Sequence, residues 1–151
     1  MTTLTTAELR HPALHQRVLA SFERQGMMVH LGAHLVQVGP GLCVVDLPYS
    51  DKVTQQQGGF HGGAMGALAD IAGGYAALTV APADAEVTTV EYKINFLAAF
   101  KRGRLRATGR VLRAGKRIIV TSATVEHLDD HGVATDCAIM QQTLATVAKT
   151  Y

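Results

Sequence analysis

One glycine-rich loop that runs into a long apolar segment constrains the fold of this chain more than any other feature. The stretch QQQGGFHGGAMGALADIAGGYAALTVAP, residues 55–82, carries five glycines in its first half. The apolar run from Gly62 to Val80 contains one charged residue, Asp70. The run approaches the length of a membrane span, but the aspartate and the internal glycines favour a helix buried in a protein core. Because burying a carboxylate costs free energy, Asp70 requires a structural or a chemical reason.

Shorter segments with helical or strand periodicity lie on both sides of this helix. Residues 11–26 have the apolar spacing of a short amphipathic helix, with Pro12 near its start and Gly26 past its end. Residues 30–49 predict two strands joined at a Gly-Pro-Gly turn. Four further strands are predicted after the long helix, at residues 85–100, 103–115, 116–130 and 132–147. The segments between these strands are short, so we expect consecutive strands to be antiparallel neighbours.

The order of these elements predicts an α+β fold in a single domain that spans residues 1–151. An antiparallel six-stranded sheet can cover an all-round apolar helix by wrapping around it. Asp70 then lies in the core unless one side of the helix opens onto a cleft, which a second subunit could provide. Apolar residues make up 48% of the chain and charged residues 17%, which favours an oligomer that buries more apolar surface than a monomer needs.

Charge and cysteine content argue against several classes of protein. The net charge is +2, but eight of the 14 lysines and arginines fall within residues 101–117, either as a solvated strand face or as a site for phosphate groups. No aromatic platform accompanies them, so we expect no nucleic acid partner.

The two cysteines and the histidines lack metal-ligand spacing, so we expect no metal site. The N-terminal sequence shows no export signal, which predicts a cytoplasmic location and no membrane association.

Several motifs occur together at defined spacing. They comprise Gln55, Gly58, the HGG triplet at residues 61–63, Asp70 nine residues after the histidine, and VEYKINFLAA at residues 90–99. This combination resembles the signature of hot-dog-fold acyl-CoA thioesterases of the phenylacetic-acid-degradation (PaaI-like) type. The resemblance covers about residues 30–147, the expected core. It implies a hot-dog fold, hydrolysis of an acyl- or aryl-CoA thioester to a free acid and CoA, and no cofactor.

The start of the apolar helix has physical properties that agree with the resemblance. Glycines at 62 and 63 let backbone approach a ligand closely, and the first N–H groups of a helix are unpaired and carry the positive end of its dipole. Such donors stabilise an oxyanion that develops on a thioester carbonyl. The resemblance implies that Gly62 supplies this N–H and that Gly63 contacts the substrate. The alternative is that both glycines only permit tight packing of the helix on the sheet.

Asp70 and four polar residues complete the implied site. The resemblance gives Asp70 the role of nucleophile or of general base for water, and the sequence does not separate these two mechanisms. The alternative is a structural aspartate that caps a loop or pairs with a base. Gln55 would hold the thioester carbonyl or position water with its amide, and His61 would fix the loop by hydrogen bonding. Thr89, with Thr88 as the neighbouring candidate, would orient water.

The resemblance also implies where the substrate lies. The acyl group would enter a cleft beside the central helix, flanked by Met65, Leu68 and Tyr75. The CoA phosphates would meet the basic segment, because guanidinium groups match phosphate geometry. The candidate contacts in this segment are Arg102, Arg104 and Arg113.

A complete site would need two subunits, as the resemblance implies. Gln55 and Gly62 would come from one subunit. Asp70 and Thr89 would come from its partner. We therefore expect a homodimer or a dimer of dimers, with the sites at the subunit interface.

Other functions are compatible with the same fold. A non-catalytic acyl-CoA-binding protein would bind the thioester without cleaving it, and release of CoA that depends on Asp70 separates the two functions. A dehydratase or hydratase needs a histidine that works with a carboxylate on the central helix, and the sequence offers Asp70 no helical histidine partner. A structural or assembly protein would leave the spacing between the HGG triplet and Asp70 unexplained.

Overall fold

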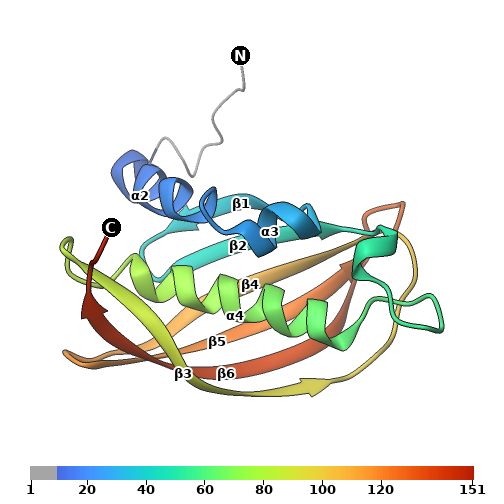
Figure 1. Ribbon diagram of the computed structural model, residues 1–151. Coiled ribbons are helices and arrows are strands. Elements are labelled where there is room, and N and C mark those ends of the chain that lie inside the picture. The colour runs from blue at the N-terminus through green and yellow to red at the C-terminus, as the bar shows by residue number, and fades with distance from the viewer. Residues whose placement is uncertain (1–9) are drawn as a thin grey trace.

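The computed structural model describes residues 10–151 as a curved antiparallel sheet around one long helix (Figure 1). In chain order the elements are α2 (Pro12–Phe22), α3 (Gly26–Leu31), β1 (His34–Gly39), β2 (Leu42–Pro48), the 3₁₀ turn η1 (Asp51–Val53), α4 (Gly62–Leu78), β3 (Ala85–Phe96), β4 (Arg104–Ala114), β5 (Ile118–Leu128) and β6 (Ala134–Ala148). The six strands lie in the order β1-β2-β4-β5-β6-β3, with every neighbouring pair antiparallel. The predicted α+β fold, with its long central helix and short N-terminal helix, is confirmed.

The N-terminal region contains one helix that the sequence analysis did not predict. α2 ends at Phe22, and Gly26 begins the six-residue helix α3 instead of following the end of a single helix. Gly32 ends α3 in the left-handed conformation, with φ of 78°. Because α3 extends to Leu31, the first strand starts at His34, later than the predicted hairpin does.

The prediction that consecutive strands are neighbours is wrong for β3 and β4. β3 lies at the edge of the sheet and pairs with β6, from Ala85 opposite Ala148 to Phe96 opposite Ala138. Residues 97–103 then carry the chain past β6 and β5 to β4. This connection is longer than a hairpin loop, and the sequence pattern identified only its last three residues as a turn. The six strands were therefore recognisable, but their order was not.

Helix α4 lies on the concave side of the sheet and forms the centre of the core (Figure 1). Eleven of its 17 residues are buried. Gly109 on β4 allows a close approach, because a Cβ atom there would lie 2.2 Å from the Ala72 carbonyl oxygen of α4. Within residues 10–151, no helix has both the length and the apolar character needed to cross a membrane.

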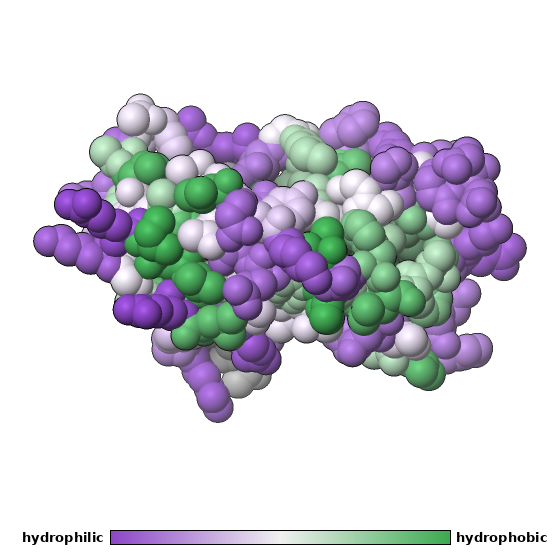
Figure 2. All heavy atoms as spheres, turned by 90° about the horizontal axis from the view of Figure 1, so that it is seen from below, coloured by the Kyte–Doolittle hydropathy of each residue, from purple (hydrophilic) through white to green (hydrophobic). Residues whose placement is uncertain are grey.

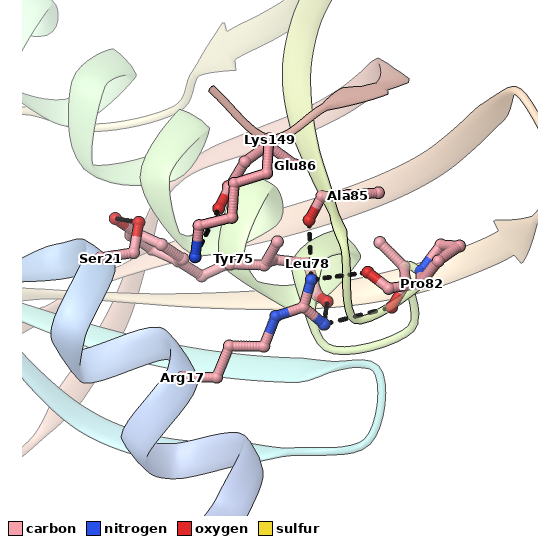
Figure 3. Close-up of polar contacts among 9 residues, drawn as sticks. Arg17, Ser21, Tyr75, Leu78, Pro82, Ala85, Glu86 and Lys149 are labelled. Atoms are coloured by element: carbon pink, nitrogen blue, oxygen red, sulfur yellow. Dashed lines mark hydrogen bonds and ion pairs between the residues drawn. The ribbon is translucent and has the colours of Figure 1, made fainter. Parts of the chain in front are cut away.

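The C-terminal end of α4 is held by a side chain of α2 that the sequence analysis did not single out. The Arg17 guanidinium donates hydrogen bonds of 2.8–3.1 Å to the carbonyls of Leu78, Ala81, Pro82 and Ala85 (Figure 3). A cation at this position also complements the negative end of the helix dipole. Arg17 thereby joins α2 to the end of α4 and to the start of β3, which fixes one wall of the pocket described below.

Candidate active site

The first turn of α4 presents one uncommitted backbone donor. His61 caps the helix, because its ring Nδ1 accepts the Gly63 N–H at 2.7 Å. The His61 carbonyl accepts from the N–H groups of Ala64 and Met65. The Gly62 N–H makes no hydrogen bond to any atom of residues 10–151. The Gly63 N–H is therefore used by the cap, whereas the Gly62 N–H can donate to a ligand.

The loop that precedes α4 is folded on itself and orients Gln55. The Gln55 N–H donates to the Gly59 carbonyl at 2.9 Å. The Gln55 Oε1 accepts from the Gln57 N–H, so the amide NH₂ group is the end that can donate to a ligand. Gln55, His61 and Gly62 form a group at the N-terminal end of α4, which we name the loop half-site.

Asp70 lies on the open side of α4 instead of inside the core. Its side chain is half-buried, and its Oδ1 accepts a hydrogen bond of 2.7 Å from the Thr89 hydroxyl of β3. The Gln142 amide of β6 donates to the same Oδ1 and, at 3.3 Å, to the Asp70 main-chain carbonyl. Asp70 Oδ2 makes no hydrogen bond to residues 10–151. We name Asp70, Thr89 and Gln142 the carboxylate half-site; one carboxylate oxygen is anchored there and the other is not.

Gln142 was missed by the sequence analysis. Its side chain is fully buried, at 0% exposure. The signal that could have identified it is the alternation of β6, where the buried Met140 and Leu144 flank Gln142 at intervals of two. A polar side chain at an inward-facing position of a strand needs a buried hydrogen-bonding partner.

A pocket of about 410 Å³ extends from the carboxylate half-site along one face of α4. Asp70, Thr88 and Thr89 line its polar part. Its α4 lining consists of positions 70, 71, 74, 75 and 78, which share one helical face. The expected cleft beside the central helix is therefore present in a single chain.

A cluster of neutral polar groups lines the same pocket away from Asp70. The Tyr75 hydroxyl makes a hydrogen bond of 3.1 Å with Ser21 and accepts one of 3.2 Å from the Gln25 amide. Figure 3 shows Ser21 of α2 reaching Tyr75 of α4, with Glu86 and Lys149 nearby. Burial raises the pKa of Tyr75, although the two hydrogen bonds act in the opposite direction. The Tyr75 hydroxyl is therefore protonated at neutral pH and can donate to a ligand.

Two of the apolar residues expected beside the acyl group face the core instead. Met65 and Leu68 belong to the buried cluster between α4 and the sheet. Tyr75, the third expected residue, lines the pocket. Position 65 lies outside the face of α4 that borders the pocket. Leu68 lies on the same side as Tyr75, but it precedes Asp70, the first residue of α4 that lines the pocket.

Among the acidic residues of the described part of the chain, residues 10–151, the buried one is Asp46 of β2. Its side chain is 4% exposed, and its carboxylate is held by Arg104 at 3.1 Å and by Arg106 at 2.7 Å. The hydrogen bond from Arg106 to Asp46 raises the pKa of Arg106. Arg104, expected at the CoA phosphates, is thus engaged in an ion pair.

The basic segment is spread along a strand and does not form one compact patch. Arg104 and Arg113 are nine residues apart in β4, a separation of about 30 Å in an extended strand. Arg102 lies in the connection before β4, close to the loop half-site, since the Phe60 N–H donates to the Phe100 carbonyl at 3.0 Å. Arg102 and Arg113 are therefore at opposite ends of the molecule.

The two half-sites are too far apart in one chain to act on one thioester. Gly62 and Asp70 are eight residues apart in α4, which corresponds to about 12 Å along the helix axis. A reacting carbonyl must lie about 3 Å from both its oxyanion donor and its nucleophile. The chain brings Asp70 together with Thr89, but it keeps this pair away from the donors at the start of α4.

Comparisons with known proteins agree with this architecture. A family model described as the thioesterase superfamily matches residues 57–134. A thioesterase family protein from Silicibacter pomeroyi, known from a crystal structure, is 35% identical with a TM-score of 0.85, over 90% of this chain and 99% of that chain. The 1,4-dihydroxy-2-naphthoyl-CoA hydrolase of Listeria monocytogenes is 33% identical over 91 residues, which are 60% of this chain and 74% of that protein. The PaaI protein of E. coli, from the phenylacetic acid degradation operon, shares the fold at 22% identity with a TM-score of 0.79, over 91% of this chain and 95% of that chain.

Proposed function

Because the chain belongs to the thioesterase superfamily, with its hot-dog fold and thioester hydrolase activity, we propose that its substrate is an acyl-CoA. Asp70 and Gly62 carry out the hydrolysis at a site that two copies of the chain share. The observation that carries this proposal is the separation of the loop half-site from the carboxylate half-site. Each half-site is ordered by hydrogen bonds within one chain. Each lacks what the other contains, a carbonyl-polarising donor or a carboxylate.

In the proposed reaction the thioester carbonyl oxygen accepts hydrogen bonds from the Gly62 N–H and the Gln55 amide of one copy. Asp70 of the other copy faces the carbonyl carbon with its Oδ2. In one route Oδ2 attacks the carbon, CoA leaves as the thiolate, and water hydrolyses the mixed anhydride. In the other route Oδ2 takes a proton from water, the resulting hydroxide attacks the carbon, and this proton passes to the departing thiolate. Both routes yield the free acid and CoA.

A second copy completes the site most simply by pairing at the β3 edge. Exposed apolar side chains follow this edge and its end, with Val90 59%, Phe96 52% and Leu97 53% exposed. Figure 2, the view from below, shows apolar areas separated by polar ones on the surface where β3 runs in Figure 1. An edge strand with unpaired backbone groups can add an antiparallel copy of itself about a two-fold axis.

The position of β3 relative to both half-sites supports this pairing. Thr89 of β3 contacts Asp70, and the Phe96 ring lies against Gly62, where an added Cβ atom would be 3.3 Å from it. An antiparallel pair of β3 strands centred between these two positions, near Tyr92, sets Thr89 of one copy opposite Phe96 of the other. The carboxylate half-site of one copy then meets the loop half-site of the other.

The acyl group occupies the pocket beside Asp70. A volume of about 410 Å³ falls within the range of small-molecule pockets. Ser21, Gln25 and Tyr75 are hydrogen-bonded to one another and line the pocket. Their hydroxyl and amide groups can exchange these bonds for bonds to a ligand, which favours an aryl acyl group that carries a hydroxyl substituent. The Listeria relative is named for a thioester of this kind, a dihydroxynaphthoyl-CoA.

The function is tested by measuring free CoA thiol released from short, medium, long, aryl and hydroxyaryl acyl-CoAs. We expect release of CoA from all the aryl thioesters of this panel, with the highest kcat/KM for a hydroxyaryl thioester. Saturable binding of these thioesters without thiol release would favour the non-catalytic binding protein instead.

Mixing two inactive variants tests the shared site. In a dimer of Asp70→Asn with Gln55→Ala, one site contains both substitutions and the other contains neither. Random reassociation of equal amounts makes about half of the dimers mixed, so we expect about a quarter of the wild-type activity to return. A mixture that stays as inactive as its parents after subunit exchange, verified by mass spectrometry, contradicts a site between copies.

A further inference from the structure

The side chain of Gln142 is enclosed between α4 and the sheet and is hydrogen-bonded at both ends. Its Nε2 donates to Asp70 Oδ1, to the Asp70 carbonyl at 3.3 Å and to Thr89 Oγ1 at 3.0 Å. Its Oε1 accepts from the Thr121 hydroxyl at 2.9 Å. Gln142 and Thr121 are both 0% exposed. A buried amide with this many partners is held in one orientation.

The direction of these hydrogen bonds follows from the chemistry of the groups. An ionised carboxylate only accepts, so the NH₂ end of the amide must face Asp70. The Thr121 hydroxyl then donates to Oε1, and the Thr89 hydroxyl donates to Asp70 Oδ1 while it accepts from Gln142. Two neutral donors therefore converge on Oδ1, and none of residues 10–151 bonds to Oδ2.

The helix provides space for this amide at one position. A Cβ atom added at Gly73 would lie 2.2 Å from Gln142 Oε1 and 2.8 Å from Thr121 Oγ1. Any larger residue at 73 would displace the amide or the hydroxyl that anchors it. Gly73 thus couples the sequence of α4 to the position of a side chain on β6.

We propose that Gln142 is a positioning residue, which acts through Asp70 by anchoring Oδ1 and presenting Oδ2 to the thioester. This role rests on the proposed hydrolysis of acyl-CoA at Asp70. A reacting group that is already held in its reactive orientation loses less entropy on reaching the transition state.

Within residues 10–151, only neutral groups hold the Asp70 carboxylate in place. β5 and β6 contribute the neutral Thr121, Gln142 and Leu144. α2 and the segment after it contribute the neutral Ser21 and Gln25. The titratable groups that share the pocket are Tyr75, Glu86, whose carboxylate lies 3.9 Å from the Lys149 ammonium, and Tyr151. The hydrogen bonds to Asp70 Oδ1 are thus donated by neutral groups.

Replacing Gln142 with methionine removes both N–H donors at similar size, and Gln141→Met is the matched control on the exposed side of β6. For Gln142→Met we expect kcat to fall about tenfold or more while KM changes less than about twofold, since the lost interaction orients the reacting group. Gln141→Met should reproduce the wild-type kcat and KM.

Introducing Gln142→Met into both the wild-type protein and Asp70→Asn separates positioning from folding. A residue that acts through Asp70 should lower kcat only where the carboxylate is present, so Gln142→Met should add no further loss to Asp70→Asn. A crystal structure of Gln142→Met should show the Asp70 carboxylate in an altered orientation or in several. An unchanged kcat and an unchanged Asp70 side chain in folded Gln142→Met overturn the positioning role. Absence of wild-type hydrolysis overturns the proposed function, and the crystal structure then still reports whether Gln142 orients Asp70.

Discussion

Two carboxylates in apolar surroundings, Asp46 and Asp70, are treated differently by this fold. Asp46 on β2 is 3% exposed and is neutralised by two arginines of β4. Asp70 on α4 is half-buried, receives hydrogen bonds from a threonine and a glutamine, and borders a pocket. A carboxylate clamped by guanidinium groups has both oxygens engaged, whereas Asp70 keeps one oxygen available.

The difference teaches how a structural and a reactive acid can be told apart. Ion pairing with arginine compensates for the desolvation of Asp46, but it leaves neither carboxylate oxygen available to react with a ligand. Neutral donors at Asp70 compensate for partial burial through one oxygen only, so the other can act as nucleophile or base. The four predictions below test this distinction, from the largest expected effect to the smallest.

The largest difference between the two carboxylates should appear in turnover. Asp70→Asn should lower kcat by about 10² or more, because it removes the proposed nucleophile or base. The asparagine amide oxygen can still accept both hydrogen bonds, so assembly and the free energy of unfolding should change little. Asp46→Asn, assayed below its unfolding temperature, should keep kcat within about threefold of wild type. Equal losses in the two variants would contradict the distinction.

Stability should show the reverse order. Asp46→Asn leaves two arginines without their counter-charge, and the pair is shielded from solvent on the aspartate side. We expect its free energy of unfolding to fall by about 2 kcal/mol, below the full cost of breaking a buried pair because both arginines are partly exposed. Urea unfolding of Asp46→Asn and Asp70→Asn in parallel measures the change in the free energy of unfolding. An unfolding midpoint of Asp46→Asn equal to that of wild type would contradict a stabilising role for Asp46.

CoA binding should depend on the arginine near the loop half-site. Arg102→Gln should raise KM for acyl-CoA about threefold with kcat nearly unchanged, as loss of uniform binding does, and added salt should reduce the difference. Arg113→Gln is the matched control at the other end of β4 and should leave KM unaltered. If Arg113→Gln rather than Arg102→Gln raises KM, the phosphates lie at the opposite end of the sheet from the loop half-site.

The two cysteines should show the smallest effect, since both are free and buried. Desolvation by burial raises the pKa of Cys43 to about 12 and that of Cys137 to about 11. At pH 8 both thiols are protonated, so a disulfide reagent should titrate neither in the folded protein and both after unfolding. As pH rises from 9 toward 12, the thiols of the unfolded chain ionise before those of the folded protein. This ionisation stabilises the unfolded state, so the free energy of unfolding should decline. Rapid reaction of the disulfide reagent with either thiol in the folded protein would contradict this burial.

The candidate site divides into a part that the sequence predicted and a part that it did not. Asp70, Gly62 and Gln55 were recognisable because they lie within one short stretch with defined spacing. Met65 faces the core and not this pocket, since an all-round apolar helix does not reveal which of its faces is open. Gln142 was missed because its role depends on a residue 72 positions away in the chain.

The sequence by itself determined the long helix and the six strands, although not helix α3, because apolar periodicity records which side of each element is buried. It therefore predicted the long helix, six strands and a carboxylate on α4. The tertiary structure alone decided that β3 leaves its neighbour in sequence to pair with β6, which brings Thr89 to Asp70 and exposes an edge. It also decided that Asp46 is the buried acid and that Gln142 holds Asp70. The physical reason is that local periodicity carries no information on which distant strands share hydrogen bonds, and every partner of Asp70 comes from such a strand.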